Sequence, residues 1–237
     1  MHKQTVKLCG LIKADIEKKL EGFKTDGVSF AVSERAYDAE ITVEAEDTLS
    51  ERSFGELLTR VFEPFKSFIY AEYAVKPAEM AVTLLLRSKN VLSTAESLTG
   101  GALAASIIEY PGVSACFYEG VVAYDNGAKK NRLGVTQSVL NSFGAVSEEC
   151  ARQMVDGLLS AGKTTVALST TGVAGPSGGS DRKPVGTVYI GIGDKSHTEA
   201  FRHVFAGDRD AVREATVNTA LFYLVKYLRG GMYSLLV

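Results

Sequence analysis

The chain has 237 residues, of which 46% are hydrophobic and 23% charged, and its formal net charge is -2. This balance is typical of a globular protein with its own core, and it lacks the strongly basic surface that would indicate nucleic acid as a partner. The apolar runs are too short to span a bilayer and the N-terminus has no signal-peptide pattern, so the sequence predicts a cytoplasmic protein without membrane association.

The residues that most often bind metals or act as catalytic bases are few. The three cysteines are widely scattered, which argues against a disulfide framework and against a zinc site. Of the three histidines, His2 lies at an end that we expect to fray, and His197 and His203 fall in a predicted outer strand. Either His197 or His203 could be the base that activates a catalytic serine, although neither lies in a recognisable motif.

Residues 1–75 predict a small α+β subdomain. A helix with apolar residues at helical spacing comes first, and two strands follow at Val28–Glu34 and Ala39–Ala45. Ser50 is placed to cap a second helix, and Phe68–Tyr73 has the composition of a third strand. The expected order is therefore helix, strand, strand, helix, strand.

Beyond Pro77, short apolar strands alternate with amphipathic helices, which predicts a layered α/β/α domain over residues 76–237. The expected strands are Asn90–Thr94, Ala115–Ala123, Thr165–Thr170, Gly186–Gly193 and His197–Phe205. The expected helices begin near Thr99, Thr136, Ser147 and Asp208.

Three segments in this domain depart from the pattern of core residues. The first, residues 94–101, places Ser97 between a predicted strand and a helix that follows two glycines. Free backbone N–H groups at such a helix start suit an oxyanion hole or a phosphate cradle. A simple helix cap by Ser97 or Thr99 fits the same residues.

The second segment, residues 121–129, runs from a strand into a polar turn that carries Tyr124, Asn126 and Lys129. A lysine acts as a general base only when its environment lowers its pKa from about 10.4 toward neutrality, and it is otherwise a solvated surface charge. The third segment, residues 170–179, leads from a strand into a loop rich in Gly, Ser and Thr. Such loops bind anions through exposed N–H groups or are mobile surface loops, and this one matches neither a Walker A nor a dinucleotide motif.

Taken together, these segments resemble the C-terminal domain of the CinA family, the nicotinamide mononucleotide deamidases. The resemblance extends in order from about residue 78 to 230, and residues 1–75 resemble the KH-like subdomain that precedes this domain in the family. The Gly-x-x-Gly loop of KH domains is absent, so RNA binding is not expected. The matching motifs are residues 94–101, Tyr110–Ser114, Gly120–Lys129, Leu133–Val135, Gly144–Glu149, Thr171–Pro176, Lys183–Val188 and Gly207–Arg209.

The resemblance implies hydrolysis of the carboxamide of nicotinamide mononucleotide to nicotinate mononucleotide and ammonia, without a metal or other cofactor. Ser97 would be the nucleophile, Lys129 its base and Tyr124 a group that orients or relays the proton. Glu96 is expected to structure the turn. Oxyanion or substrate contacts are expected from Thr99, Gly100, Gly101, Asn126, Thr171, Gly172, Gly175 and Arg209.

The family resemblance also implies a homo-oligomer with a small-molecule nucleotide as its substrate. Two other functions stay open on the sequence. One is a nucleotide-binding regulatory module without turnover, and the other is an amidohydrolase that acts on a different pyridine nucleotide amide.

Overall fold

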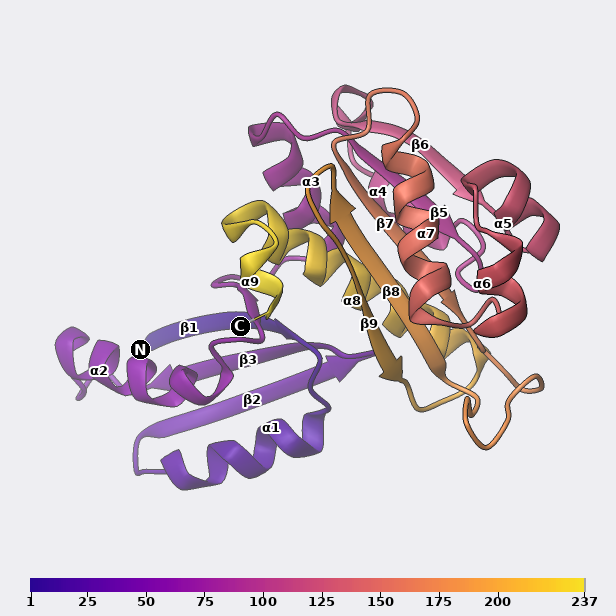
Figure 1. Ribbon diagram of the computed structural model, residues 1–237. Helices are drawn as coiled ribbons and strands as arrows, with labels where there is room; N and C mark the ends of the chain where they lie inside the picture. The colour runs from indigo at the N-terminus through magenta and orange to yellow at the C-terminus, as the bar shows by residue number, and fades with distance from the viewer. Residues whose placement is uncertain (237) are drawn as a thin grey trace.

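The computed structural model describes residues 1–236 and contains two β-sheets with helices packed against them (Figure 1). The first sheet has the order β2-β3-β1-β4, and each pair of neighbouring strands in it is antiparallel. Its strands are β1 (His2–Cys9), β2 (Val28–Arg35), β3 (Asp38–Ala45) and β4 (Ile69–Ala71). Helices α1 (Lys13–Leu20) and α2 (Glu51–Phe62) bury Ile16, Leu20, Phe54 and Val61 in a core shared with this sheet. We call residues 1–75 the small unit.

Strand β1 corrects the expected order of elements, which began with a helix. It lies inside the sheet, paired with β3 along its whole length and with β4 at Lys7 and Leu8. Two lysines interrupt its apolar pattern, but cross-strand ion pairs accommodate them: Lys3 Nζ lies 2.8 Å from Glu44 and Lys7 Nζ lies 3.0 Å from Asp38. A strand of this kind does not show the simple alternation from which strands are predicted.

His2 is also placed differently from the expectation that it lies in a frayed end. It belongs to β1, its ring stacks on Phe54 with centroids 5.2 Å apart, and its Nε2 lies 2.7 Å from the carbonyl oxygen of Leu49.

The second sheet has the order β6-β5-β7-β8-β9. Strand β5 is parallel to β6 and β7, whereas β8 is antiparallel to both β7 and β9. Its strands are β5 (Leu92–Glu96), β6 (Phe117–Val122), β7 (Val166–Gly172), β8 (Thr187–Asp194) and β9 (Thr198–Val204). The large unit, residues 76–236, contains this sheet and the remaining helices.

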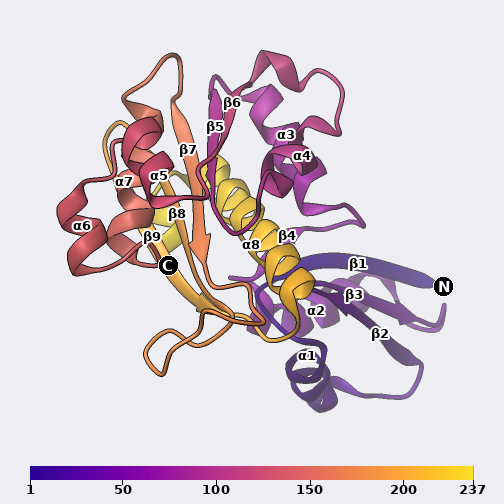
Figure 2. The same cartoon turned by 90° about the vertical axis from the view of Figure 1, so that its right-hand side faces the viewer.

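Helices cover both faces of the second sheet, which confirms the layered α/β/α architecture (Figures 1 and 2). On β7, Val166 and Leu168 belong to the core with α3, α4 and α8, whereas Ala167 between them belongs to the core with α5 and α7. The helices are α3 (Pro77–Arg87), α4 (Ala102–Ile108), α5 (Asn126–Leu133), α6 (Gln137–Ser142), α7 (Glu148–Leu159), α8 (Arg209–Gly230) and α9 (Tyr233–Leu236).

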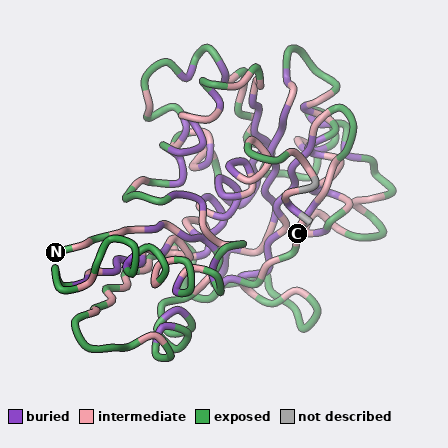
Figure 3. Tube along the Cα trace, turned by 90° about the vertical axis from the view of Figure 1, so that its left-hand side faces the viewer, coloured by how far each residue is buried: buried purple, intermediate pink, exposed green. Residues whose placement is uncertain are grey.

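Helix α8 packs against both sheets. It contacts β7 and β8 of the large unit and also β1, β3 and β4 of the small unit. Cys9, Tyr70 and Ala71 of the small unit therefore lie in the same hydrophobic core as Leu221 and Leu224 of α8. Figure 3 shows buried segments running through the interior of both units, with exposed residues on the outer loops and helices.

Most helix starts agree with the sequence. The side chains of Ser50, Thr136, Ser147 and Asp208 each accept a hydrogen bond from the N–H group three residues later. Helix α5 was instead expected to be a polar turn, because its residues have no apolar stripe. It begins at Asn126, where the Asp125 side chain caps it at 2.7 Å from the Gly127 amide.

Gly157 of α7 generates the first prediction, because helices α7 and α5 approach closely there. A Cβ atom at Gly157 would lie 2.1 Å from the carbonyl oxygen of Leu133, which is a backbone clash. Gly157→Ala should therefore lower the thermal midpoint, although alanine is favoured over glycine in a helix by about 1 kcal/mol.

Gly55 of α2 is the matched control, since a Cβ there meets nothing within 4 Å, and Gly55→Ala should raise the midpoint. Circular dichroism melts of both variants test this. Equal midpoints for the two would show that the close approach does not constrain α5.

Candidate active site

The three segments that stood out in the sequence meet at the carboxyl ends of β5, β6 and β7. These parallel strands end at Glu96, Val122 and Gly172, so the residues after them lie at one edge of the sheet. A cavity of about 220 Å³ opens there. It is lined by Ser97, Leu98, Tyr124, Asn126, Lys129, Ala145, Val146, Thr171, Gly172, Ala174 and Arg209.

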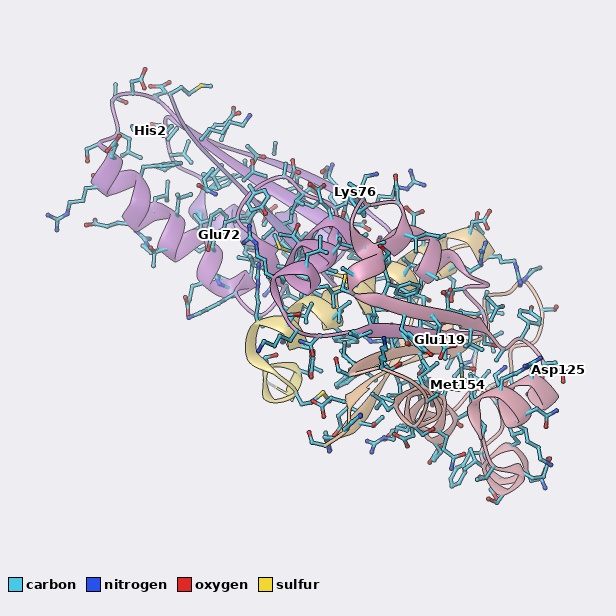
Figure 4. The ribbon with its side chains drawn as sticks, turned by 90° about the horizontal axis from the view of Figure 1, so that it is seen from above. His2, Glu72, Lys76, Glu119, Asp125 and Met154 are labelled. Atoms are coloured by element: carbon cyan, nitrogen blue, oxygen red, sulfur yellow. The ribbon has the colours of Figure 1, made fainter. Side chains whose placement is uncertain are left out.

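The cavity lies far from the start of the chain. In Figure 4, Asp125, which precedes α5, is at the opposite end of the molecule from His2. A larger cavity of about 480 Å³ is formed mainly by β1, α2 and the segment around β4 of the small unit, and its lining residues include no serine, cysteine or histidine. Of these two cavities, the smaller one has the groups needed for nucleophilic chemistry.

Ser97 and Lys129 are in direct contact at the base of the cavity. Lys129 Nζ donates a hydrogen bond to Ser97 Oγ at 2.9 Å, and it also contacts the carbonyl oxygens of Ala123 and Tyr124 at 2.9 Å each. Lys129 is 1% exposed and Ser97 is 8% exposed. Lys129 is thus a buried side chain and not the solvated charge that its polar neighbours in the sequence suggested.

The surroundings of Lys129 favour its neutral form. Burial lowers its pKa from the ordinary value of 10.5, although Cys150 and Asp125 act in the opposite direction. Within residues 1–236, Lys129 forms no salt bridge that would hold it as an ammonium. A neutral amine has two N–H donors and one lone pair. With the two carbonyls as acceptors for these donors, the lone pair is left for the hydroxyl proton of Ser97.

Glu96 organises the loop that carries Ser97. Its carboxylate is fully buried and accepts hydrogen bonds from three amides: Gly101 at 2.9 Å, Leu103 at 3.0 Å and Ala104 at 2.8 Å. These amides form the start of α4, so Glu96 occupies the positive end of that helix. Helix α4 has no other side-chain cap, which answers the open question of whether Ser97 or Thr99 is merely a helix cap.

The structure does not support the expected contact of Gly100 and Gly101 with an oxyanion or substrate. Gly100 and Gly101 have φ angles of 62° and 96°, which glycine adopts readily. Their amides already donate to Ser97 and Glu96 and neither residue lines the cavity, so they do not face an oxyanion. Thr99 is also outside the lining, with its hydroxyl 2.7 Å from that of Thr170.

Tyr124 and Arg209 lie together at the mouth of the cavity. The Tyr124 side chain is largely exposed, and its hydroxyl accepts a hydrogen bond from Arg209 Nη2 at 3.4 Å. Lys129 contacts the backbone carbonyl of Tyr124 and not its hydroxyl. The Tyr124 hydroxyl therefore does not have the position expected of a proton relay between Ser97 and Lys129. Arg209 also donates to the carbonyl of Gly175 at 2.8 Å, which is how Gly175 takes part although it does not line the cavity.

The remaining expected residues lie on the cavity wall. Asn126 is exposed, and Thr171 and Gly172 end β7, where the Thr171 hydroxyl donates to the carbonyl of Ala145 at 2.7 Å. The sequence did not predict the apolar part of the cavity wall, because apolar residues there look the same in the sequence as core residues. This part is formed by Leu98, Ala145, Val146 and Ala174.

Arg213 was also missed, although its position one helical turn after Arg209 was a usable signal. Its Nη2 donates to the carbonyl of Thr99 at 3.0 Å and so holds the loop after Ser97.

The two histidines that stayed open are bonded elsewhere. His197 contacts Glu199, and His203 Nε2 lies 2.8 Å from the Tyr223 hydroxyl. Burial lowers the pKa of His203 to about 4. In the described chain, no group of three or more His, Cys, Asp or Glu is arranged to hold a metal ion. None of the described helices is long and apolar enough to cross a membrane.

Comparison with known proteins gives the same answer as the motifs. Residues 75–228 match the family model of the CinA C-terminal domain. The chain belongs to the CinA family. Its similarity to a competence-damage inducible protein of Clostridium tetani is 35% identity over 232 residues, or 95% of this chain and 56% of the relative. A CinA-like protein of Thermotoga neapolitana is 40% identical over 174 residues, or 73% of this chain and 42% of the relative. The chain thus spans about half the length of these CinA relatives.

Solved CinA structures share the fold of the large unit. A CinA superfamily protein of Klebsiella pneumoniae has a TM-score of 0.62 and 35% identity, covering 65% of this chain and 96% of its own. A competence/damage inducible protein of Agrobacterium tumefaciens has a TM-score of 0.62 and 36% identity, covering 67% of this chain and 99% of its own. Each is matched over nearly its whole length by about two thirds of this CinA chain.

Glu96 generates the second prediction. Glu96→Ala leaves three amides without their acceptor, so we expect the free energy of unfolding to fall by about 3 kcal/mol or more. Glu96→Gln should cost less, because its amide oxygen still accepts hydrogen bonds. Urea titrations of both variants measure the difference. A Glu96→Ala protein as stable as the unchanged chain would show that the carboxylate does not hold the loop.

Proposed function

We propose that this protein hydrolyses the carboxamide of nicotinamide mononucleotide, with Ser97 as nucleophile and Lys129 as base. The observation that carries the proposal is the 2.9 Å contact between Ser97 Oγ and the buried amine of Lys129 in a cavity that Arg209 borders. Membership in the CinA family agrees with it. The products are nicotinate mononucleotide and ammonia.

The first chemical step joins Ser97 to the substrate. Neutral Lys129 takes the proton of the Ser97 hydroxyl while Oγ attacks the carboxamide carbon, and the carbonyl oxygen becomes an oxyanion. The amide of Leu98 is the candidate to stabilise it, since Leu98 lines the cavity and, within the described residues, its amide donates no hydrogen bond to the protein. An oxyanion donor is worth about 3 kcal/mol in the transition state.

The second half of the reaction releases the two products. Protonated Lys129 gives its proton to the departing nitrogen, so ammonia leaves and an acyl ester remains on Ser97. Lys129, neutral again, then removes a proton from a water molecule that attacks the ester. Lys129 returns this proton to the Ser97 oxygen as the ester bond breaks, and the carboxylic acid that leaves loses its remaining proton to solvent, which gives nicotinate mononucleotide.

The size and charge of the site fit a nucleotide that is only partly enclosed. A volume of about 220 Å³ is below the roughly 300 Å³ at which small-molecule sites begin, so the cavity suits the pyridine carboxamide alone. The ribose and phosphate would then extend to the mouth. There the Arg209 guanidinium has donors beyond the two used by Gly175 and Tyr124, and its planar fork suits a phosphate. The contact between Tyr124 and Arg209 supports a role for Tyr124 in orienting the substrate.

The third prediction tests the nucleophile. Ser97→Ala should reduce ammonia release from nicotinamide mononucleotide by about a thousandfold or more, because the attacking hydroxyl is gone. Its thermal midpoint should stay close to that of the unchanged protein, because the cap of α4 is Glu96. Ser106→Ala in α4 is the matched control and should keep full activity. Turnover by Ser97→Ala near the original rate would contradict the mechanism.

The fourth prediction tests the base. Activity should rise with pH through a pKa below 10.5, because burial lowers the pKa of Lys129 and only its neutral form accepts the Ser97 proton. Lys129→Met should remove most turnover and spare binding. Lys129→Arg should fail as well, since a guanidinium stays protonated.

Steady-state kinetics of both variants across pH separate this from a phosphate anchor. If Lys129 merely held the substrate phosphate, arginine would restore much of the rate and methionine would chiefly raise KM.

A further inference from the structure

The turn between β2 and β3 has an unusual backbone for its residues. Arg35 lies opposite Asp38 in the strand register, so Ala36 and Tyr37 alone form the turn. Both have left-handed φ angles, 49° and 64°. A two-residue turn of this geometry favours Asn-Gly, and residues other than glycine are strained in it. Such strain persists where surrounding contacts hold the residue in place.

The contacts that hold this turn come from the large unit. The Tyr37 ring packs on Phe205 with centroids 5.0 Å apart, and its hydroxyl accepts a hydrogen bond from the Ala206 amide at 3.4 Å. The side chain of Asn218 donates to the carbonyl of Ala36 at 3.1 Å. In Figure 1 the ends of β2 and β9 lie side by side, in agreement with these contacts.

The segment that Tyr37 contacts leads directly into the candidate active site. Phe205 and Ala206 follow β9, and Asp208 then caps α8, whose first residue is Arg209. Arg209 reaches the cavity mouth, and Arg213 one turn later holds the carbonyl of Thr99. Phe205 is further tied to the loop that ends at Gly186, through a 3.0 Å hydrogen bond between their backbones.

We propose that Tyr37 of the small unit is a positioning residue for Arg209, and that the small unit thereby raises the affinity of the site for a phosphate-bearing substrate. Tyr37 fixes the segment 205–208, and this segment fixes the start of α8. The proposal rests on the proposed function for the identity of the substrate.

The effect belongs to binding and not to the chemical step. Ser97 follows β5 and Lys129 belongs to α5, and Tyr37 contacts neither element. Among the described residues, the one hydrogen bond from α8 to this loop comes from Arg213, which binds the carbonyl of Thr99, two residues after Ser97, and lies one helical turn beyond Arg209. Tyr37 should therefore change KM and leave kcat nearly unchanged.

The fifth prediction compares substitutions within the turn. Tyr37→Gly removes the ring yet suits the left-handed backbone, so the hairpin stays folded. We expect it to raise KM for nicotinamide mononucleotide about tenfold, with kcat within about twofold. Ala36→Gly relieves the same strain and keeps the ring, so its KM should be unchanged. Tyr37→Phe should stay close to the unchanged protein, because the ring contact remains.

Two further measurements separate the possible outcomes. Nicotinamide riboside lacks the phosphate, and its kcat/KM should be the same for Tyr37→Gly and the unchanged protein. Hydrogen exchange of the amides in residues 205–213 should be faster in Tyr37→Gly than in Ala36→Gly, whether or not the protein is a deamidase.

Faster exchange without deamidation by the unchanged protein would contradict the proposed function and leave the positioning role standing. Equal exchange and equal KM in Tyr37→Gly and Ala36→Gly would overturn the positioning role.

Discussion

The site depends on burying the amine of Lys129 next to the hydroxyl of Ser97 without a salt bridge to the amine. Removing a lysine from water is unfavourable unless its donors are satisfied or it becomes neutral. Here two backbone carbonyls, those of Ala123 and Tyr124, and the Ser97 hydroxyl surround Lys129 Nζ. A carboxylate in their place would hold the proton on the nitrogen, and the amine could not act as a base. The two carbonyls can accept both N–H groups of a neutral amine, and its lone pair then faces the Ser97 hydroxyl, as the proposed mechanism requires.

Several elements serve this arrangement. Asp125 caps the start of α5, the helix that carries Lys129. The close approach at Gly157 lets α7 cover α5, and Cys150 and Met154 of α7 close the apolar layer beside it. Glu96 fixes the adjoining loop from inside, because its carboxylate sits where a phosphate would bind at an open helix start. Under the proposed function, the substrate phosphate would then bind elsewhere, and Arg209 is the cation on the cavity wall that has donors left for it.

The sequence was sufficient for every strand except β1, for most helix starts and for the segments that meet at the site. Ser97, Lys129 and Arg209 could be named because each lies in a motif that follows a strand or begins a helix. The burial of Lys129 could not be predicted, since α5 has no apolar stripe and the burial comes from α7 and the sheet. Gly100 and Gly101 were expected to contact the oxyanion or the substrate. The sequence did not show that the Glu96 side chain accepts the hydrogen bond of the Gly101 amide. Strand β1 was missed because its lysines are paired with Glu44 and Asp38 on a neighbouring strand.

Helix α8 has a consequence for how this protein can be divided. The linker before Pro77 is a boundary in the sequence, yet the core on one side of α8 is continuous with residues of β1 and β4. Cutting the chain there would expose part of that core to water, at about 25 cal/mol for each Å² of apolar surface. A chimera that exchanges the small unit for another would have to redesign the matching face of α8 as well. The two units are separate along the chain, but they are not independent in stability, because both pack against α8. A graft of the small unit must therefore include α8.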